Sequence, residues 1–369
     1  ALDYLTVEGN ETAGDNSQVY ESDQNRRYPA RERIRNVTLS DAVYAERGGA
    51  RLADAALITT FDTALSRHMI HRKDWRDKDY AFVTSVKAAL RERGTEATVV
   101  MEKELRQFVT KNVFHPVLMR GLSRQQRMRI LPSKMFLKEK YFPNGDFDKL
   151  KARLVAGGHR QDRSLYREED TSSPTAVQCS VMSVCAIAAS EGRQVACCDI
   201  GGAVLNANMP KDGVKVLVRI DRTLSEMLIN MFPDDYKSFA TETGELVVEL
   251  DRAMYGCVEA AKLWFDTIRN KLLDMGFTQN DYDLCVFNRV ENDGPQCTIV
   301  LHVDDMLITC EDAGVISSVI GDILKSYPDT KYQLGPMLPY LGMDLDFSTE
   351  GEVRITMDGM VNDILAKSG

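Results

Sequence analysis

Two adjacent aspartates, Asp304 and Asp305, interrupt an otherwise apolar run in the segment LHVDDML, residues 301–307. The residues on either side, 299–303 and 306–308, have the composition of two buried strands. A strand, two carboxylates and a second strand predict a hairpin with paired negative charge at its tip. Carboxylates held together beside a core need a neutralising cation, and Mg²⁺ commonly uses one or two carboxylates together with substrate phosphates. The pattern therefore indicates metal-assisted phosphoryl chemistry.

A third aspartate, Asp199, has a similar setting at the end of the short apolar run RQVACCDI. A lone aspartate at the end of a strand is more often a turn residue or a helix cap than a metal ligand. The pair at 304–305 makes the ligand interpretation of Asp199 the favoured one, because one metal site then accounts for all three residues.

The charge of the chain is unevenly distributed. The net charge is −9, but residues 120–167 contain thirteen Lys or Arg and four Asp or Glu, a local charge of +9. A basic block on an acidic protein is typical of a surface that contacts phosphates. The alternative is a solvated surface with charge on one side. We favour phosphate contact, because the acidic remainder includes the paired carboxylates.

Composition excludes several other classes of protein. The 369 residues are 44% hydrophobic, as in a globular protein, and no stretch has the ~18 apolar residues of a membrane span. No signal-peptide pattern opens the chain. The eight cysteines include no CxxC pair. The sequence therefore predicts a reduced, intracellular protein without a disulfide framework or a zinc site.

Periodicity predicts an α+β fold in which strands carry the site and helices cover one face. Residues 1–45 have the composition of a linker, and the folded body is expected to begin near Thr95. Helices are expected at 96–111, 176–190, 259–275, 315–326 and 358–367. Strands are expected at 130–140, 149–158, 193–200, 215–220, 246–251, 285–290, 296–303, 305–309, 340–347 and 352–356.

With this order laid out, the chain resembles the reverse transcriptase of copia-type long-terminal-repeat retrotransposons. Six blocks occur in the family's order and together are highly specific. They are KARLVAGGHRQD (151–162), SSPTA (172–176), DIGGAVLNANM (199–209), LDRAMYGCVEAAKLW (250–264), LHVDDMLIT (301–309) and YLGMDLD (340–346).

The resemblance implies a right-hand polymerase with palm and fingers. Only a short run follows EVRIT, so we expect a truncated or absent thumb and no ribonuclease H segment. We expect a polar, linker-like region at 1–94 and fingers with the start of the palm at 95–198. The palm with an interleaved fingers segment is expected at 199–335, and a primer-grip-like hairpin with the start of a thumb at 336–369.

The family's active site uses three palm aspartates and two Mg²⁺ or Mn²⁺ ions. By block, the resemblance assigns this role to Asp199, Asp304 and Asp305, and the carbonyl of Ile200 is a further candidate ligand. Two such ions clamp an in-line displacement at phosphorus.

The resemblance also assigns nucleotide contacts. Lys151 and Arg153 lie two apart on one face of a predicted strand, and the matching fingers element of relatives contacts the incoming triphosphate. Glu259 lies in the loop that abuts the new base pair, where many relatives have Gln. Val204 occupies a position where relatives usually carry Tyr or Phe, a ring that excludes a ribose 2′-hydroxyl. The segment 340–343 resembles the primer grip.

The resulting hypothesis is an RNA-directed DNA polymerase that extends a primer on an RNA or DNA template with dNTPs. Its expected location is a cytoplasmic virus-like particle of the element. One alternative is a copia-derived chain that binds nucleic acid or a partner protein without polymerising. Another is a non-templated nucleotidyltransferase with the same chemistry.

Overall fold

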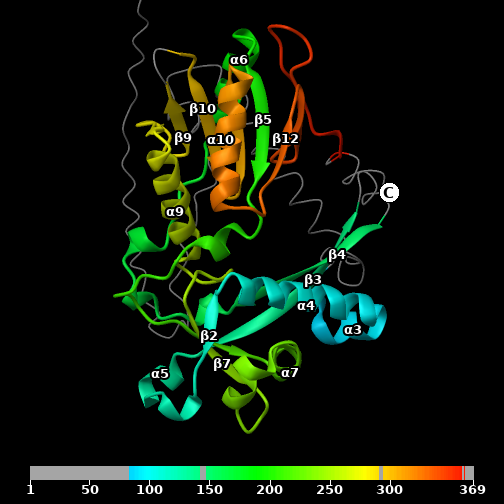
Figure 1. Ribbon diagram of the computed structural model, residues 1–369, viewed down its shortest axis with the longest axis vertical. Helices are drawn as coiled ribbons and strands as arrows, with labels where there is room; N and C mark the ends of the chain where they lie inside the picture. The colour runs from blue at the N-terminus through cyan, green and yellow to red at the C-terminus, as the bar shows by residue number, and fades with distance from the viewer. Residues whose placement is uncertain (1–82, 142–146, 291–293, 360, 362–369) are drawn as a thin grey trace, which may run out of the picture. The chain divides into compact units, whose positions relative to one another are not determined.

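The computed structural model describes residues 83–141, 147–290, 294–359 and 361. All of them belong to the second of two units, which divide between Asp79 and Tyr80. Two six-stranded sheets and one three-stranded sheet form this unit, with helices packed against them (Figure 1). In the described residues, no helix is both long and apolar enough to cross a membrane.

The first sheet has the strand order β1-β3-β6-β7-β2, and β4 pairs with β3 at the side. A long antiparallel hairpin dominates it, with β3 (Leu131–Tyr141) and β4 (Phe147–Ala156). Helix α4 (Thr95–Thr110) packs on β4 and buries one face of its periodic pattern. The sheet is completed by β1 (Val83–Ser85), β2 (Phe114–Pro116), β6 (Leu217–Ile220) and β7 (Leu246–Leu250), with helices α3 (Val86–Arg93), α5 (Arg124–Met128), α7 (Arg222–Met231) and α8 (Pro233–Tyr236) around it.

The folded body begins earlier than the sequence predicts. Strand β1 pairs antiparallel with β3, and α3 follows it directly, capped by the Ser85 hydroxyl. The boundary expected near Thr95 therefore falls between two helices of one folded unit. The local pattern gives little warning, because β1 has only three residues and depends on β3, which is distant in sequence.

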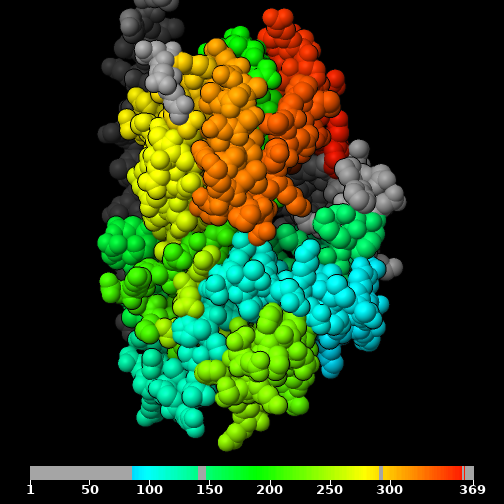
Figure 2. Space-filling view, in the orientation of Figure 1, coloured from blue at the N-terminus to red at the C-terminus, as the bar shows by residue number. Residues whose placement is uncertain are grey.

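The second sheet has the order β12-β5-β11-β10-β9-β8. Its strands are β5 (Gln194–Asp199), β8 (Thr278–Gln279), β9 (Val286–Arg289), β10 (Cys297–His302), β11 (Asp305–Cys310) and β12 (Lys331–Leu334). Helices α9 (Ala260–Asp274) and α10 (Ala313–Ser326) cover one face, and α10 packs on β5 and β11 (Figure 1). In the same orientation, Figure 2 shows the atoms of the α10 region, drawn in orange, covering the front of this part of the molecule.

The opposite face of the second sheet packs on helix α6 (Gln178–Ser190) and on the three-stranded sheet. The small sheet contains β13 (Met337–Tyr340), β14 (Met343–Asp346) and β15 (Arg354–Thr356). Because side chains alternate along a strand, Val195 and Leu307 belong to this core while Ala196 and Met306 belong to the other. The second sheet is thus covered on both faces, which explains its nearly continuous apolar strands.

The predicted strand at 340–347 is interrupted. Leu341 and Gly342 form a tight turn between β13 and β14, and both have positive φ, at 52° and 78°. Two consecutive positive φ values are typical of a type I′ hairpin turn. The expected helix at 358–367 lies mostly outside the described residues, and the linker expected at 1–45 lies wholly outside them.

Candidate active site

The aspartate pair lies on a tight hairpin, as the sequence predicts. His302 at the end of β10 pairs with Asp305 at the start of β11, so Val303 and Asp304 form the two-residue turn. Val303 has φ 59°, a conformation that β-branched residues rarely adopt. Hydrogen bonds to both carbonyls hold the turn: the Asp304 carbonyl accepts from the Ile200 N–H at 3.0 Å, and the Val303 carbonyl accepts from the Trp264 indole at 2.6 Å.

Asp199 is the last residue of β5, and it lies directly opposite Asp305 in the antiparallel register of β5 and β11. Cross-strand partners project to the same face of a sheet, with Cβ atoms about 5 Å apart. Asp199 is exposed, whereas Asp304 and Asp305 are partly buried. Two carboxylates that are more than a hundred residues apart in sequence are therefore brought together by strand pairing alone.

The electrostatics of the three aspartates are coupled. Burial raises the pKa of Asp305 to about 6, and the negative charges of Asp304 and Asp199 add to the shift. Uncompensated carboxylates repel one another, so a cation at this place removes the repulsion.

The donor set fits a hard divalent ion, because its contacting atoms are carboxylate oxygens. Within the part of the chain that the structure describes, however, no group of three or more Asp, Glu, His or Cys side chains is already arranged to hold a metal. The backbone register brings the aspartates together, but the side chains do not form a finished cage. The Ile200 carbonyl remains a predicted ligand; its amide is the group that holds Asp304.

Lys331 is a further candidate site residue, which the sequence alone does not predict. It opens β12 and lies opposite Asp199 on the other side of β5, so Asp305, Asp199 and Lys331 form a row across three strands. A cation in that row can offset carboxylate or phosphate charge. The sequence gives little signal for it, since every residue of β12 is exposed and the strand has no alternating burial pattern.

Lys151 and Arg153 lie on one side of β4, as predicted, with buried Ala152 between them on the other side. The guanidinium of Arg153 lies over the ring of Tyr255, 4.5 Å from its centroid. Burial raises the pKa of the Tyr255 phenol, Arg153 opposes the shift, and the charges of Asp304 and Glu104 add to it. The charges of both Arg153 and Asp304 thus act on the Tyr255 phenol.

Glu104 on α4 is the anionic neighbour of this cation pair. Its Oε1 accepts a hydrogen bond from the Leu154 N–H at 3.1 Å. Burial raises the pKa of the Glu104 carboxyl, and the Leu154 hydrogen bond and the charges of Arg153 and Lys151 partly oppose the shift. The charge of Glu104 therefore interacts with the charges of Arg153 and Lys151 in the protein alone.

The loop around Glu259 is joined to the end of β4 by close backbone contact. A Cβ on Gly158 would lie 1.9 Å from the Gly256 carbonyl oxygen, and one on Gly256 would lie 2.2 Å from that of Ala156. The Ala156 N–H also donates to the Tyr255 carbonyl at 2.8 Å. Only glycine at positions 158 and 256 allows these two segments to lie this close. Close backbone packing therefore explains a glycine at each of the two positions.

Glu259 is buried, with 4% of its surface exposed. Its carboxylate accepts from the Gln161 amide at 2.9 Å and from the Tyr166 hydroxyl at 3.2 Å. Gln161 in turn accepts from the Val258 N–H at 2.9 Å. These contacts give Glu259 a structural tether to the segment after β4, and its predicted role in nucleotide binding stays a prediction.

Val204 lies in a short 3₁₀ turn, Ala203–Asn206, that follows Asp199. It is 7% exposed and belongs to the larger core. The turn is fixed from α4, because Lys111 contacts Asn206 Oδ1 at 2.8 Å and Asp329 at 3.0 Å. Val204 thus lies in a turn that follows Asp199 closely in the chain. Its effect on the choice between ribose and deoxyribose stays a prediction.

The expected primer-grip segment forms the β13–β14 hairpin. The Tyr340 hydroxyl donates to the Val300 carbonyl on β10 at 3.2 Å. Burial, with the charge of Asp305 added, raises the pKa of the Tyr340 phenol. The hairpin therefore packs on the strand that leads to the aspartate turn, and its contact with a primer stays a prediction.

The basic block is spread over α5, the β3–β4 hairpin and the turns that follow. Of its members with described side chains, Arg153 is partly buried and the others are exposed. Arg129 and Arg160, with Lys215 from outside the block, line a cavity of about 160 Å³. The exposed basic side chains are compatible with phosphate contact and with a solvated charged surface, so phosphate contact by this block stays a prediction.

Comparison with known proteins identifies the family. The family model for reverse transcriptase (RNA-dependent DNA polymerase) matches residues 123–369, more than half of the chain, and the chain belongs to this family. It is 27% identical over 195 residues to a retrovirus-related Pol polyprotein from transposon TNT 1-94 of Nicotiana tabacum, covering 53% of this chain and 13% of the relative. These matches confirm the resemblance to retrotransposon polyproteins.

Two further relatives have similar names and similarly partial coverage. A Pol polyprotein from transposon RE1 of Arabidopsis thaliana is 27% identical over 203 residues, 53% of this chain and 12% of the relative. A putative transposon Ty5-1 protein of Saccharomyces cerevisiae is 28% identical over 117 residues, 32% of this chain and 37% of the relative. The chain thus spans well under half the length of these relatives.

Solved structures also match at low score. A telomerase from Candida albicans, in complex with a fragment of telomeric RNA, matches with a TM-score of 0.39 and 11% identity, over 88% of this chain and 61% of the other. A foamy viral protease–reverse transcriptase in complex with double-stranded DNA matches with a TM-score of 0.33 and 10% identity, over 69% of this chain and 35% of the other.

Proposed function

We propose that the chain is an RNA-directed DNA polymerase that adds dNTPs to a primer 3′-hydroxyl on an RNA or DNA template. The observation that carries the proposal is the register of the second sheet. Asp199 and Asp305 are cross-strand partners, and Asp304 lies in the adjoining turn. This backbone arrangement supports a site made of the three carboxylates, and the chain belongs to the reverse transcriptase family.

Asp199, Asp304 and Asp305 would hold two Mg²⁺ or Mn²⁺ ions. Such ions, when bound, lower the pKa of the attacking hydroxyl and neutralise charge on the triphosphate and the leaving pyrophosphate. The chain supplies oxygen ligands whose mutual repulsion, visible in the raised pKa of Asp305, favours cation binding.

Cations of the chain would bind the incoming nucleotide. The planar guanidinium of Arg153 can donate two parallel hydrogen bonds to a phosphate, and it lies over the Tyr255 ring. Lys151 lies two residues away on the same strand, and Lys331 lies opposite Asp199. We assign the triphosphate to Arg153 and Lys151, and we assign Lys331 the role of offsetting charge that develops on the transferred phosphoryl group.

The first sheet and its hairpin would then act as fingers, the second sheet as palm, and the β13–β14 hairpin as a primer contact. The exposed basic block would contact the template–primer backbone. Within this proposal the particle of a retrotransposon is the place of action, since the related polyproteins are transposon proteins.

One alternative is a member of the family that binds nucleic acid without polymerising. The unfinished metal cage favours it, since no described group of three or more ligating side chains is arranged around one point. The intact set of three aspartates favours the polymerase.

Primer extension by the purified chain tests the proposal. The substrate is oligo(dT) annealed to poly(rA), with dTTP and either Mg²⁺ or Mn²⁺. We expect extension that disappears in Asp304→Asn/Asp305→Asn. A folded wild-type chain that binds the template–primer tightly and extends nothing supports the binding protein instead.

Template dependence separates the polymerase from a non-templated nucleotidyltransferase. The same chain is given a template of mixed sequence and all four dNTPs. A polymerase yields the complementary sequence, whereas a terminal transferase yields products whose sequence does not follow the template.

A further inference from the structure

Trp264 connects helix α9 with the aspartate turn. Its side chain is buried, with 1% of its surface exposed, and its one polar atom donates to the Val303 carbonyl at 2.6 Å. A buried indole N–H needs an acceptor, and here the acceptor is a backbone group of the turn that carries Asp304.

The turn needs such support. Val303 has φ 59°, and a β-branched residue in this region is strained and persists only where its surroundings hold it. Both carbonyls of the two-residue turn have a donor, Ile200 N–H for Asp304 and Trp264 Nε1–H for Val303. The first donor comes from the residue after Asp199, and the second comes from α9.

Trp264 also contacts the element that leads to Lys331. Its ring lies edge to face against Tyr327, with centroids 5.6 Å apart and planes at 76°. The Tyr327 carbonyl accepts from both the N–H and the hydroxyl of Thr330, the residue before Lys331, at 3.1 and 2.7 Å. One side chain therefore contacts the aspartate turn and the tight loop before β12.

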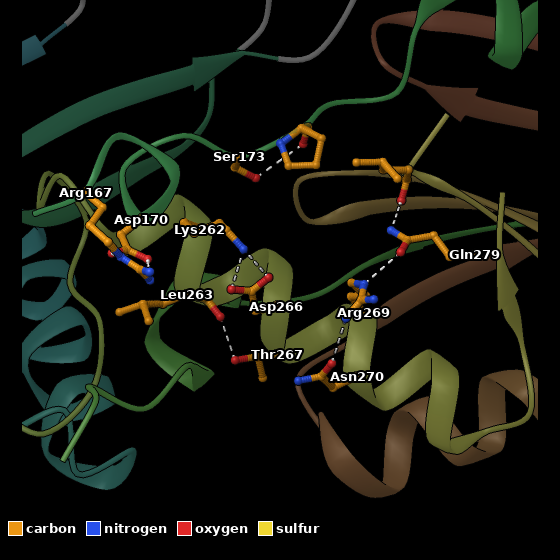
Figure 3. Close-up of polar contacts among 12 residues, drawn as sticks. Arg167, Asp170, Ser173, Lys262, Leu263, Asp266, Thr267, Arg269, Asn270 and Gln279 are labelled. Atoms are coloured by element: carbon orange, nitrogen blue, oxygen red, sulfur yellow. Dashed lines mark hydrogen bonds and ion pairs between the residues drawn. The ribbon is translucent and has the colours of Figure 1, made fainter. Parts of the chain in front are cut away.

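The helix that carries Trp264 is fixed from its outer side. Figure 3 shows Lys262 and Asp266 facing each other along α9, and Arg269 directed toward Gln279 of β8. The Arg269 Nε donates to Gln279 Oε1 at 2.8 Å. This hydrogen bond ties α9 to β8, a strand of the same sheet that carries the aspartate turn.

We propose that Trp264 is a positioning residue for polymerisation, whose indole N–H holds the strained Val303 turn and thereby places Asp304 and Asp305 relative to Asp199 and Lys331. This inference rests on the proposed function of the same aspartates. Because Trp264 is buried and its N–H donates to the Val303 carbonyl, the proposed role acts through the turn. Its contribution is the geometry of the turn, and misplacement of reacting groups lowers turnover more than it lowers binding.

The decisive variant is Trp264→Phe, which keeps an aromatic ring against Tyr327 and removes the N–H. We expect kcat for dTTP addition to fall about tenfold, with KM for dTTP and affinity for the template–primer within twofold of wild type. Phe265→Leu is the matched control, because Phe265 is the neighbouring core residue on α9 and is also buried, at 6% exposed. It should lower Tm and leave kcat unchanged.

A second substitution, at Val303, tests whether strain in the turn is the reason that Trp264 matters. Glycine adopts positive φ without strain, so Val303→Gly makes the turn less dependent on the indole. In a Val303→Gly background, Trp264→Phe should cost less than threefold in kcat. A cost that stays tenfold, or a Trp264→Phe variant with wild-type kcat, overturns the inference.

A measurement without turnover separates this inference from the proposed function. Amide hydrogen exchange across residues 301–307 should quicken in Trp264→Phe and stay at the wild-type rate in Phe265→Leu. If the wild-type chain extends no primer, the proposed polymerase fails while the exchange result still decides whether Trp264 holds the turn. Unchanged exchange in Trp264→Phe contradicts the inference in either case.

Discussion

Asp305 at the start of β11 lies opposite Asp199 at the end of β5. Burial raises the pKa of the Asp305 carboxyl to about 6, and the negative charges of Asp304 and then Asp199 add to the shift. The folded state therefore binds a proton at Asp305 more tightly than the unfolded chain does. The corresponding stabilisation is present below the ordinary pKa of about 4 and is lost as the pH rises through about 6.

Asp305→Asn should therefore stabilise the metal-free protein at pH 7.5 while abolishing activity. We expect a gain in Tm of roughly 2–4 °C after allowance for solvent screening, and a loss of primer extension of about 10³-fold. Thermal unfolding at pH 7.5 and at pH 4 provides the measurement. The gain should shrink at pH 4, and Mg²⁺ should raise the Tm of the wild type more than that of the variant.

Lys331 lies opposite Asp199 on the other edge of β5, so its charge is close to where phosphate charge develops. Lys331→Met should lower kcat by about 10–100-fold, because an offsetting cation is lost at the transition state. Lys331→Arg should retain a measurable part of the activity. Lys325→Met, which removes an exposed lysine paired with Asp322, serves as the control and should have wild-type kcat. Equal rates for Lys331→Met and wild type would exclude the role.

Arg153 is placed to bind triphosphate with its planar fork, backed by the Tyr255 ring. Arg153→Lys keeps the charge and removes the fork and the stacking, so KM for dNTP should rise about tenfold with a smaller change in kcat. Steady-state kinetics at fixed template–primer give the measurement. Arg222→Lys changes an exposed arginine paired with Glu226 and should leave KM unaltered. A wild-type KM in Arg153→Lys would remove Arg153 from the nucleotide site.

Glu104 gives a separate test through stability. Burial raises the pKa of its carboxyl, so the charged form is disfavoured in the fold and stability falls as the pH rises through the folded pKa. Glu104→Gln keeps an acceptor for the Leu154 N–H and removes the charge. It should raise Tm by about 2 °C at pH 7.5, and the gain should vanish below pH 4, where both side chains are neutral. A lower Tm at pH 7.5 would show that the attraction of Arg153 outweighs burial.

The sequence predicts those residues whose structure depends on their immediate neighbours in the chain, and it does not predict those whose structure depends on distant residues. The aspartate hairpin can be predicted because its apolar strands flank the charges directly. Helices α4, α9 and α10 have amphipathic patterns of their own, and α6 is predicted from its apolar composition. Lys331 is not readable, because β12 exists through its pairing with β5 and has no burial pattern of its own. The burial of Glu259 depends on Gln161, which is 98 residues away in the chain. Contacts between residues so far apart produce no periodic pattern of apolar residues in the sequence.

Val204 tests sugar selection, because it follows Asp199 in the tight 3₁₀ turn and is smaller than the ring expected there in relatives. We expect weak discrimination against rNTPs in the wild type and at least about tenfold stronger discrimination in Val204→Tyr, since a ring next to the sugar leaves no room for a 2′-hydroxyl. Single-nucleotide incorporation of dTTP and UTP gives the ratio. Because Val204 is 7% exposed, an added ring costs about 1–3 kcal/mol of stability, so Tm is followed in parallel. Val204→Ile adds bulk without a ring and should keep the wild-type ratio. A strong preference for dTTP in the wild type that Val204→Tyr leaves unchanged would show that another residue selects the sugar.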